Sequence, residues 1–335
     1  LDRIDQHIAV LNNFEHYGNK AQLPQGILLS GPPGVGKTTI ARYIFSNING
    51  EVLEFSANEA GSLKDISDAY KEARDRKDAT KRPVILFVDE VVNKLQHQTA
   101  NLLEEFSGIN SKRNAGIFFV GTSNQGFDSL GGNATYDPGI GYRDSALYRP
   151  GRLEIIEIGP PNLQAKADLI ALNLGRESVL YNGNQLDVAS MMPFYQTGAF
   201  VESVVNEVIL RKLYGQSAYG TNNVPVEITD MDLVMTINSI LMGNKQSGML
   251  TEKQKRKTAR HEIGHYLVAR ELGYGAAFIS VEQHSETFGY AHLTPHESDL
   301  ISTVDDLTNR MKIFMGGYVT DTISRDGDIS IGCIS

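Results

Sequence analysis

The chain has 335 residues, a formal net charge of −9 at neutral pH and 41% hydrophobic residues. That length suffices for two or three domains with sizeable cores. The acidic balance argues against a nucleic-acid motor built on a basic stripe, and the single cysteine, Cys333, argues against a disulfide framework and favours a reducing compartment. No apolar run approaches the roughly 20 residues that a bilayer span needs.

The first half of the chain alternates short apolar runs with helix-compatible stretches. Strands are predicted at 27–30, 52–55, 84–88, 117–121 and 154–158, with helices between them such as 62–77 and 96–106. This alternation predicts an α/β domain whose parallel sheet is covered on both faces.

A glycine-rich segment, GPPGVGKT at 31–38, follows the first predicted strand and precedes a predicted helix. This is a G-x-x-x-x-G-K-T phosphate loop in the context that it requires. Its backbone N–H groups would wrap phosphates at a helix N-terminus, Lys37 would reach the outer phosphates, and the Thr38 hydroxyl could hold Mg²⁺. The alternative is a Gly-rich turn that binds nothing. The predicted nucleotide contacts are Gly34, Val35, Gly36, Lys37, Thr38 and Thr39.

The third predicted strand ends in two acidic residues, Asp89 and Glu90. An apolar strand that simply meets solvent at two acids is common. Beside a phosphate loop, however, the pair predicts that Asp89 holds Mg²⁺, directly or through water, and that Glu90 polarises the attacking water. The sequence therefore predicts hydrolysis of a nucleoside triphosphate.

The pattern changes after Gly159-Pro160-Pro161. Helices are predicted at 162–174, 197–214 and 229–242, as expected of a small all-helical subdomain, and 243–248 reads as a flexible linker. We therefore divide the chain into a nucleotide-binding subdomain (1–160), a helical lid (161–243), a linker (244–257) and a further domain (258–335).

The last predicted domain opens on a helix-compatible stretch that contains His261, Glu262 and His265 in the pattern H-E-x-x-H. Two histidines four residues apart share one helix face and can ligate one Zn²⁺. Glu262 can take a proton from the water that attacks a peptide carbonyl. The alternative is a solvated helix whose histidines happen to have this spacing. The motif predicts a zinc peptidase with His261 and His265 as metal ligands.

These motifs occur in the order found in FtsH-type membrane-anchored AAA metalloproteases, which the chain resembles over nearly its whole length. The order is the phosphate loop, Asp89-Glu90, GTSN at 121–124, RPGR at 149–152, a helical lid and HEIGH at 261–265. The resemblance implies an α/β AAA+ ATPase with a five-stranded parallel sheet and a small helical lid, followed by the start of a mainly helical zinc metallopeptidase domain.

The resemblance also implies an activity and partners. We expect an ATP-dependent zinc endopeptidase that uses ATP, Mg²⁺ and Zn²⁺ and acts on protein substrates in a ring, a hexamer in the family. The chain opens at Leu1 without a methionine. We interpret it as a fragment that is membrane-associated through a segment outside this chain. The catalytic part would lie in the bacterial cytoplasm, the mitochondrial matrix or the plastid stroma.

Three further residues acquire roles from the resemblance. Asn124 would sense the γ-phosphate, and Arg149 and Arg152 would point across a subunit boundary into the neighbour's nucleotide site. Guanidinium groups supplied in this way stabilise the charge that develops in phosphoryl transfer. The alternative is a surface turn with solvated arginines.

The resemblance places the third zinc ligand, an aspartate, directly after a stretch like 331–335. We therefore predict an acidic residue immediately after Ser335 and weak zinc binding by these 335 residues alone. Isolated histidines near strands are more often ordinary polar residues. This applies to the other candidate ligands, which are His284, His292 and His296, and Asp326 and Asp328 rank only slightly higher.

Two departures from the family pattern affect substrate handling. The segment 55–62 is shorter than in the family and lacks its aromatic-hydrophobic-glycine tripeptide, and Glu90 is followed by VVNK at 91–94 without a further acid. A remodelling or protein-import motor with the peptidase region as an inactive scaffold is therefore the alternative function. A AAA module acting on nucleic acid is a third hypothesis, which the acidic balance disfavours.

Overall fold

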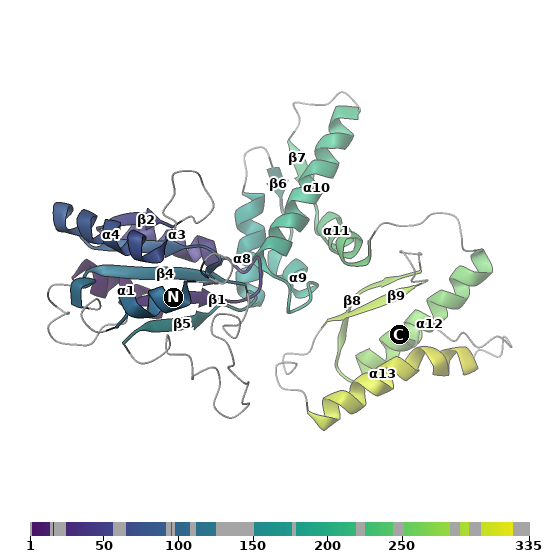
Figure 1. The fold of residues 1–335 in the computed structure, drawn as a ribbon. Coiled ribbons are helices and arrows are strands. Elements are labelled where there is room, and N and C mark those ends of the chain that lie inside the picture. The colour runs from purple at the N-terminus through teal and green to yellow at the C-terminus, as the bar shows by residue number, and fades with distance from the viewer. Residues whose placement is uncertain are drawn as a thin grey trace. The chain divides into compact units, whose positions relative to one another are not determined.

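The structure is a computed structural model (Figure 1). It describes residues 2–13, 16, 25–55, 65–91, 95, 98–107, 112–124, 151–175, 179–218, 225–243, 251–281, 289–294 and 303–323. The chain divides into two compact units, Leu1–Gly159 and Pro160–Ser335.

The first unit is built on a five-stranded sheet whose strands are all parallel, as predicted. The strand order is β2-β3-β4-β1-β5, so that β1 lies between β4 and β5. The strands are β1 (Gly26–Ser30), β2 (Glu51–Glu54), β3 (Val84–Val88), β4 (Ile117–Ser123) and β5 (Leu153–Glu157).

Helices cover both faces of this sheet, and residues of β1 alternate between the two cores. Leu28 packs in the core that contains residues of α4 and α6, whereas Ile27 and Leu29 pack in the core that contains residues of α1 and α3. Every residue of β3 is buried, which is typical of a parallel strand covered on both sides. The helices are α1 (Asp2–Asn12), α3 (Lys37–Asn47), α4 (Ile66–Thr80) and α6 (Thr99–Glu105).

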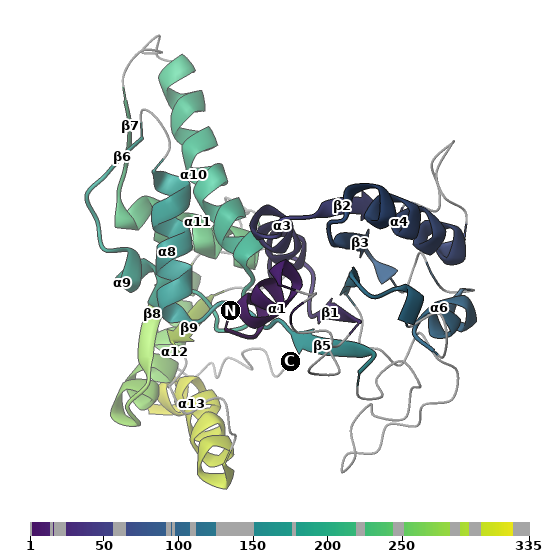
Figure 2. The ribbon, with the colours of Figure 1, turned by 90° about the vertical axis from the view of Figure 1, so that its left-hand side faces the viewer.

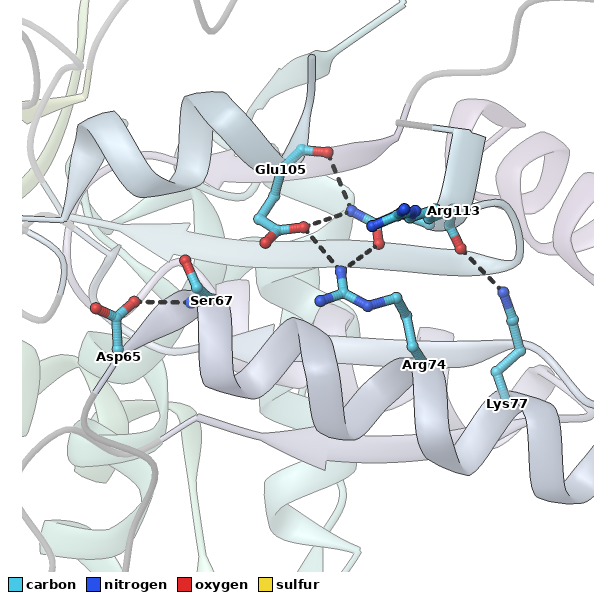
Figure 3. Close-up of polar contacts among 7 residues, drawn as sticks. Asp65, Ser67, Arg74, Lys77, Glu105 and Arg113 are labelled. Atoms are coloured by element: carbon cyan, nitrogen blue, oxygen red, sulfur yellow. Dashed lines mark hydrogen bonds and ion pairs between the residues drawn. The ribbon is translucent and has the colours of Figure 1, made fainter. Parts of the chain in front are cut away.

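A buried polar network joins α4 to the end of α6 and to the turn before β4 (Figure 3). The Arg74 guanidinium donates through Nη1 to Glu105 Oε2 and to Asn114 Oδ1, both at 2.9 Å. Asn114 Nδ2 donates in turn to Glu105 Oε2 at 2.9 Å and to the Glu105 carbonyl at 3.0 Å. Oε2 of the Glu105 carboxylate therefore accepts two hydrogen bonds, although only 4% of the residue is exposed.

The second unit begins with a bundle of helices in which α8 lies beside α10 (Figure 2). A single core joins these helices and includes residues of both short strands. The elements are α8 (Leu163–Leu174), β6 (Val179–Tyr181), α9 (Gln185–Ser190), α10 (Gly198–Ala218), β7 (Val226–Ile228) and α11 (Asp230–Met242).

The expectation of an all-helical lid is wrong, because β6 and β7 form a parallel two-stranded ladder. Val226 and Ile228 are buried while Glu227 between them is exposed. This alternation buries one face of β7 in the helical core. Three residues are too few for the period to stand out in the sequence.

The rest of the second unit holds α12 (Glu252–Glu271), β8 (Gly275–Ser280), β9 (Tyr290–Thr294) and α13 (Val304–Ile323). Strands β8 and β9 pair antiparallel. The predicted linker 244–257 is wrong at its end, since α12 already begins at Glu252. Thr251 and Gln254 form a capping box there, and the Lys- and Arg-rich residues that follow favour a helix.

Within the described ranges, no helix combines the length and the apolar character needed to cross a bilayer.

Candidate functional site

The phosphate loop connects β1 to α3, and two glycines give it a shape that other residues rarely adopt. Gly34 and Gly36 have φ angles of 79° and 94°, and Gly36 is the N-cap of α3. Lys37 begins the helix, and its Nζ donates to the carbonyls of Gly31 at 2.9 Å and Pro32 at 2.7 Å. The ammonium group therefore lies inside the curve of the loop, where phosphate oxygens would compete for it.

Lys37 also lies close to the two acids that follow β3. Burial lowers the pKa of the Lys37 ammonium, and the negative charges of Asp89 and Glu90 oppose that shift. The structure thus brings these three predicted residues together at the carboxyl ends of β1 and β3. Thr38 and Thr39 follow in the first turn of α3.

A hydrogen-bonded group links the ends of β3 and β4. Val88 is paired with Gly121, so Asp89 and Thr122 follow side by side. The Thr122 hydroxyl donates to Asp89 Oδ1 and accepts from the Glu90 N–H at 2.9 Å. Asn124 Nδ2 lies 3.4 Å from Glu90 Oε1, toward which it donates. The sequence predicted roles for Asp89, Glu90 and Asn124 but none for Thr122, which lies in the GTSN segment at 121–124.

Glu90 has a φ of 54°, in the left-handed region that non-glycine residues seldom occupy. Such a conformation costs on the order of 1–3 kcal/mol and persists where surrounding contacts hold it. The hydrogen bond from its N–H to Thr122 is one such contact. Strain of this kind clusters at functional sites, in agreement with a catalytic role for Glu90.

The structure describes only one of the two predicted arginines, Arg152. Arg149 lies outside the described residues. Arg152 Nη2 donates to the hydroxyl of Ser107 at 2.8 Å, just beyond α6, and the Arg152 carbonyl accepts from the Gln25 N–H at 2.8 Å. Its guanidinium is therefore held at the end of α6 in its own chain, and its role toward a neighbouring subunit stays a prediction.

His261 and His265 lie one turn apart on α12, with ring centroids 4.8 Å apart. His261 Nδ1 is 2.9 Å from Asp321 Oδ2, and His265 Nδ1 is 2.8 Å from the Ile313 carbonyl. Both partners can accept a hydrogen bond, so a neutral ring protonated at Nδ1 would leave its Nε2 able to bind a metal. A metal-binding histidine is normally fixed in this way by its other ring nitrogen.

The two Nε2 atoms converge above Gly317 of α13. A Cβ placed on Gly317 would lie 2.6 Å from both. Both Nε2 atoms thus lie close to one point beside Gly317, an arrangement in which a single metal ion, bound at about 2.0–2.1 Å from each nitrogen, could be shared by both histidines. The donor set and this arrangement fit zinc.

Close contact between α12 and α13 creates this arrangement (Figure 1). The helices run antiparallel, since His261 meets Asp321 near the end of α13 while His265 meets Ile313. They touch at Gly264 and Gly316, where a Cβ on Gly264 would come within 2.5 Å of the Gly316 carbonyl. Two glycines thus let the backbones approach until the histidines reach α13.

The electrostatics of the motif suit its predicted chemistry. Glu262 is 9% exposed, and burial raises the pKa of its carboxyl while the charge of His261 opposes the shift. Gly289, just before β9, lies beside this carboxyl group, since a Cβ on Gly289 would be 2.9 Å from Glu262 Oε1. Burial also lowers the pKa of His265 and favours the neutral ring that binds metals, against the hydrogen bond to Ile313.

No third ligand joins the two histidines in the part of the chain that the structure describes, where no group of three His, Cys, Asp or Glu residues suits a metal. His292 lies in β9, paired with Phe278. The remaining candidates, His284, His296, Asp326 and Asp328, lie outside the described residues, as does the end of the chain at Ser335.

Sequence reasoning also missed Asp321, the partner of His261. A signal was available, because Ile313, Gly317 and Asp321 recur at intervals of four on one helix and therefore share a face. What the sequence does not tell is that this face packs against the two histidines.

Comparisons with known proteins define the class. The model for the ATPase family associated with various cellular activities (AAA) matches residues 27–135, and the model for peptidase family M41 matches residues 248–335. The chain thus joins a AAA ATPase domain to M41 peptidase sequence.

Several curated relatives match 96% of the chain. The ATP-dependent zinc metalloprotease FtsH 2 of Thermoanaerobacter sp. (strain X514) is 27% identical over 340 residues, and the FtsH of Metamycoplasma arthritidis is 29% identical over 347. The YME1 homolog of Caenorhabditis elegans is 27% identical over 341 residues. Over nearly its whole length the chain is similar to these ATP-dependent zinc metalloproteases, at 27–29% identity. It spans 62%, 43% and 43% of the lengths of these relatives.

Proposed function

We propose that the protein is an ATP-dependent zinc endopeptidase, in which ATP hydrolysis in an oligomeric ring unfolds protein substrates and delivers them to the H-E-x-x-H site. The observation that carries this proposal is the convergence of His261 Nε2 and His265 Nε2 above Gly317. It supports a metal site rather than a solvated helix. The same chain holds a phosphate loop with Asp89 and Glu90 close to Lys37.

In the ATPase half, each group has a distinct task. The loop N–H groups and Lys37 bind the phosphates, and Thr38 and Asp89 hold Mg²⁺. Glu90 orients the attacking water, and Asn124 lies close enough to Glu90 to couple that carboxylate to the γ-phosphate. Arg149 and Arg152 act on the neighbour's nucleotide, which makes the site complete only in a ring, a hexamer by family resemblance.

In the peptidase half, His261 and His265 hold zinc through Nε2, and Asp321 and the Ile313 carbonyl keep their rings in place. Bound zinc supplies Lewis acidity that polarises the peptide carbonyl. Glu262, whose carboxyl has a raised pKa, takes a proton from the attacking water and gives it to the leaving amine. The proposed third ligand is the family aspartate beyond 331–335.

Two substitutions test the ATPase assignment. Lys37→Ala should weaken nucleotide binding, because it removes the phosphate contact. Glu90→Gln should leave binding intact and suppress turnover, because it removes the water-orienting carboxylate. Nucleotide affinity and ATPase rate measured on both variants check this, and an unchanged rate in Glu90→Gln contradicts the role of Glu90.

The peptidase assignment is tested by degradation of casein with and without ATP, together with the zinc content of the same samples. Glu262→Gln should abolish cleavage and retain metal, because the glutamate acts on water and is not a ligand. Zinc lost together with activity in this variant would contradict the separation of the two roles.

A remodelling or protein-import motor is the second candidate. It is favoured by the segment 55–62, which lacks the family tripeptide. ATPase activity without any casein degradation in a zinc-loaded sample would support it. Both candidate functions are compatible with attachment to a membrane through a segment outside this chain.

A further inference from the structure

We propose that Thr122 is a positioning residue for ATP hydrolysis: its hydroxyl bridges Asp89 and Glu90 and aims the Glu90 carboxylate at the attacking water. The inference rests on the proposed roles of these two acids and extends them to a residue of the neighbouring strand. Nothing in the phosphate-loop or H-E-x-x-H motifs includes Thr122.

The hydroxyl is placed where both acids meet. Thr122 follows the Val88–Gly121 pair of the β3–β4 ladder and is only 1% exposed. A hydroxyl has one proton to donate and lone pairs to accept with. Thr122 donates the proton to Asp89 Oδ1 and accepts the Glu90 N–H. Both of its hydrogen bonds therefore go to the two predicted catalytic acids.

Each bond has a separate consequence for the site. The bond to Oδ1 restricts the rotation of the Asp89 carboxylate, which would hold the cation or its water. The bond from the N–H holds the backbone of Glu90 at its left-handed φ of 54°. The direction of a side chain follows from its backbone, so the position of the Glu90 carboxylate depends on this bond.

The proposed role predicts which kinetic constant changes. Phosphate binding by the loop and Lys37 does not involve Thr122, so the affinity for ATP should stay the same. The step that needs an aimed carboxylate should slow. A residue that merely fills space between β3 and β4 would be replaced by valine, which has nearly the same shape, without loss of rate.

The experiment measures steady-state ATPase kinetics and nucleotide affinity of the whole chain for the parent and three variants. Thr122→Val should lower kcat about 10- to 100-fold, the range typical when a partner of a metal-site group is removed. Its KM should stay within about twofold of the parent. Thr122→Ser restores the hydroxyl and should recover most of the rate. Thr236→Val removes the hydroxyl of another buried threonine, 2% exposed in α11, and should behave as the parent.

Several results would overturn the inference. These are an unchanged kcat in Thr122→Val, equal losses in the valine and serine variants, or a loss of nucleotide affinity that accounts for the lower rate. If Thr122→Val does not fold, as judged by circular dichroism, Thr122→Ala, which also removes the hydroxyl, carries the same test.

Glu90→Gln in the same assay separates this inference from the proposed function. Turnover in Glu90→Gln would remove the basis of both. If Glu90→Gln abolished turnover while Thr122→Val stayed fully active, the role of Glu90 would stand and that of Thr122 would be rejected.

Discussion

Gly317 has no side chain at the point where the two histidine rings of the zinc site converge. We predict that Gly317→Ala abolishes zinc binding, because its methyl group would lie 2.6 Å from both Nε2 atoms. The helix itself favours alanine over glycine by roughly 0.5–1 kcal/mol, so α13 should still form. Zinc titration checks the prediction on parent and variant chains that both extend past Ser335 to the predicted acidic ligand.

The control is Gly215→Ala, a glycine of α10 that has open space around its Cβ position. It should leave zinc binding unchanged. Equal zinc affinity in Gly317→Ala and the parent would mean that the metal does not use the space between the two Nε2 atoms.

At the scale of elements, the ion pair between Arg74 and Glu105 holds α4 against α6. Glu105 is buried, whereas the Arg74 side chain is 25% exposed and can reach solvent. We predict that Glu105→Ala costs about 3 kcal/mol in the free energy of unfolding, the lower end for a broken buried pair. Urea unfolding of the single and double variants with Arg74→Ala checks this, and the double variant should cost less than the sum of the singles.

The exposed pair Glu72–Arg76 on the same helix provides the comparison. Glu72→Ala should change stability by no more than about 0.5 kcal/mol, because solvent screens an exposed pair. Comparable losses for Glu72→Ala and Glu105→Ala would show that burial does not set the strength of the α4–α6 connection.

Lys166 gives the helical part of the second unit a dependence on pH. The residue is 3% exposed, and its Nζ donates to the carbonyls of Pro193 and Phe194 at 2.7 and 3.1 Å. Burial lowers the pKa of Lys166 below its ordinary value of 10.5. The unfolded chain then binds this proton more tightly than the folded one, so stability should rise as the pH increases from the lowered pKa to 10.5.

We therefore predict that Lys166→Met removes this rise. Urea unfolding of parent and variant between neutral pH and 10.5 isolates the effect, because all other titrating groups are common to both. The loss of a donor to two carbonyls shifts the variant's stability by the same amount at every pH. Parallel stability curves for parent and variant would contradict the lowered pKa.

Some elements could be predicted from the sequence and others could not. The strands of the parallel sheet are continuous apolar runs such as Val84–Val88, and the alternating pattern predicted all five. The β6–β7 ladder was missed because three residues on each side carry too little periodicity. The start of α12 was missed because a charged, Lys-rich segment suggests a linker until its capping box is considered.

For the site, motifs that are contiguous in the chain could be predicted, namely the phosphate loop, Asp89-Glu90 and H-E-x-x-H. The residues that orient them could not. Thr122 reaches Asp89 only through the pairing of β3 with β4, and Asp321 reaches His261 only through the packing of α12 on α13. Such contacts depend on tertiary structure, which no local pattern encodes.

At the scale of the whole molecule, the predicted role of Arg152 requires more than one chain. We expect Arg152→Ala to lower the ATPase rate while the affinity of a single subunit for nucleotide stays the same, because the guanidinium would act on a neighbour. The specific activity of the parent should also rise with protein concentration as subunits assemble. Rate measurements over a dilution series check both expectations.

Ser107→Ala serves as the companion variant, since it removes only the hydroxyl to which Arg152 donates. A parent activity that is independent of concentration, with Arg152→Ala as active as the parent, would rule out a contribution across subunits.

The central position of β1 has a consequence for biosynthesis. The strand that leads into the phosphate loop is made early, yet it pairs with β4 and β5, which end at Ser123 and Glu157. Ribosomes add about 5–20 residues per second, so β1 waits for several seconds with both edges exposed. Pairing over such a distance along the chain also folds slowly. We therefore expect the nascent protein to remain accessible to chaperones until β5 has emerged.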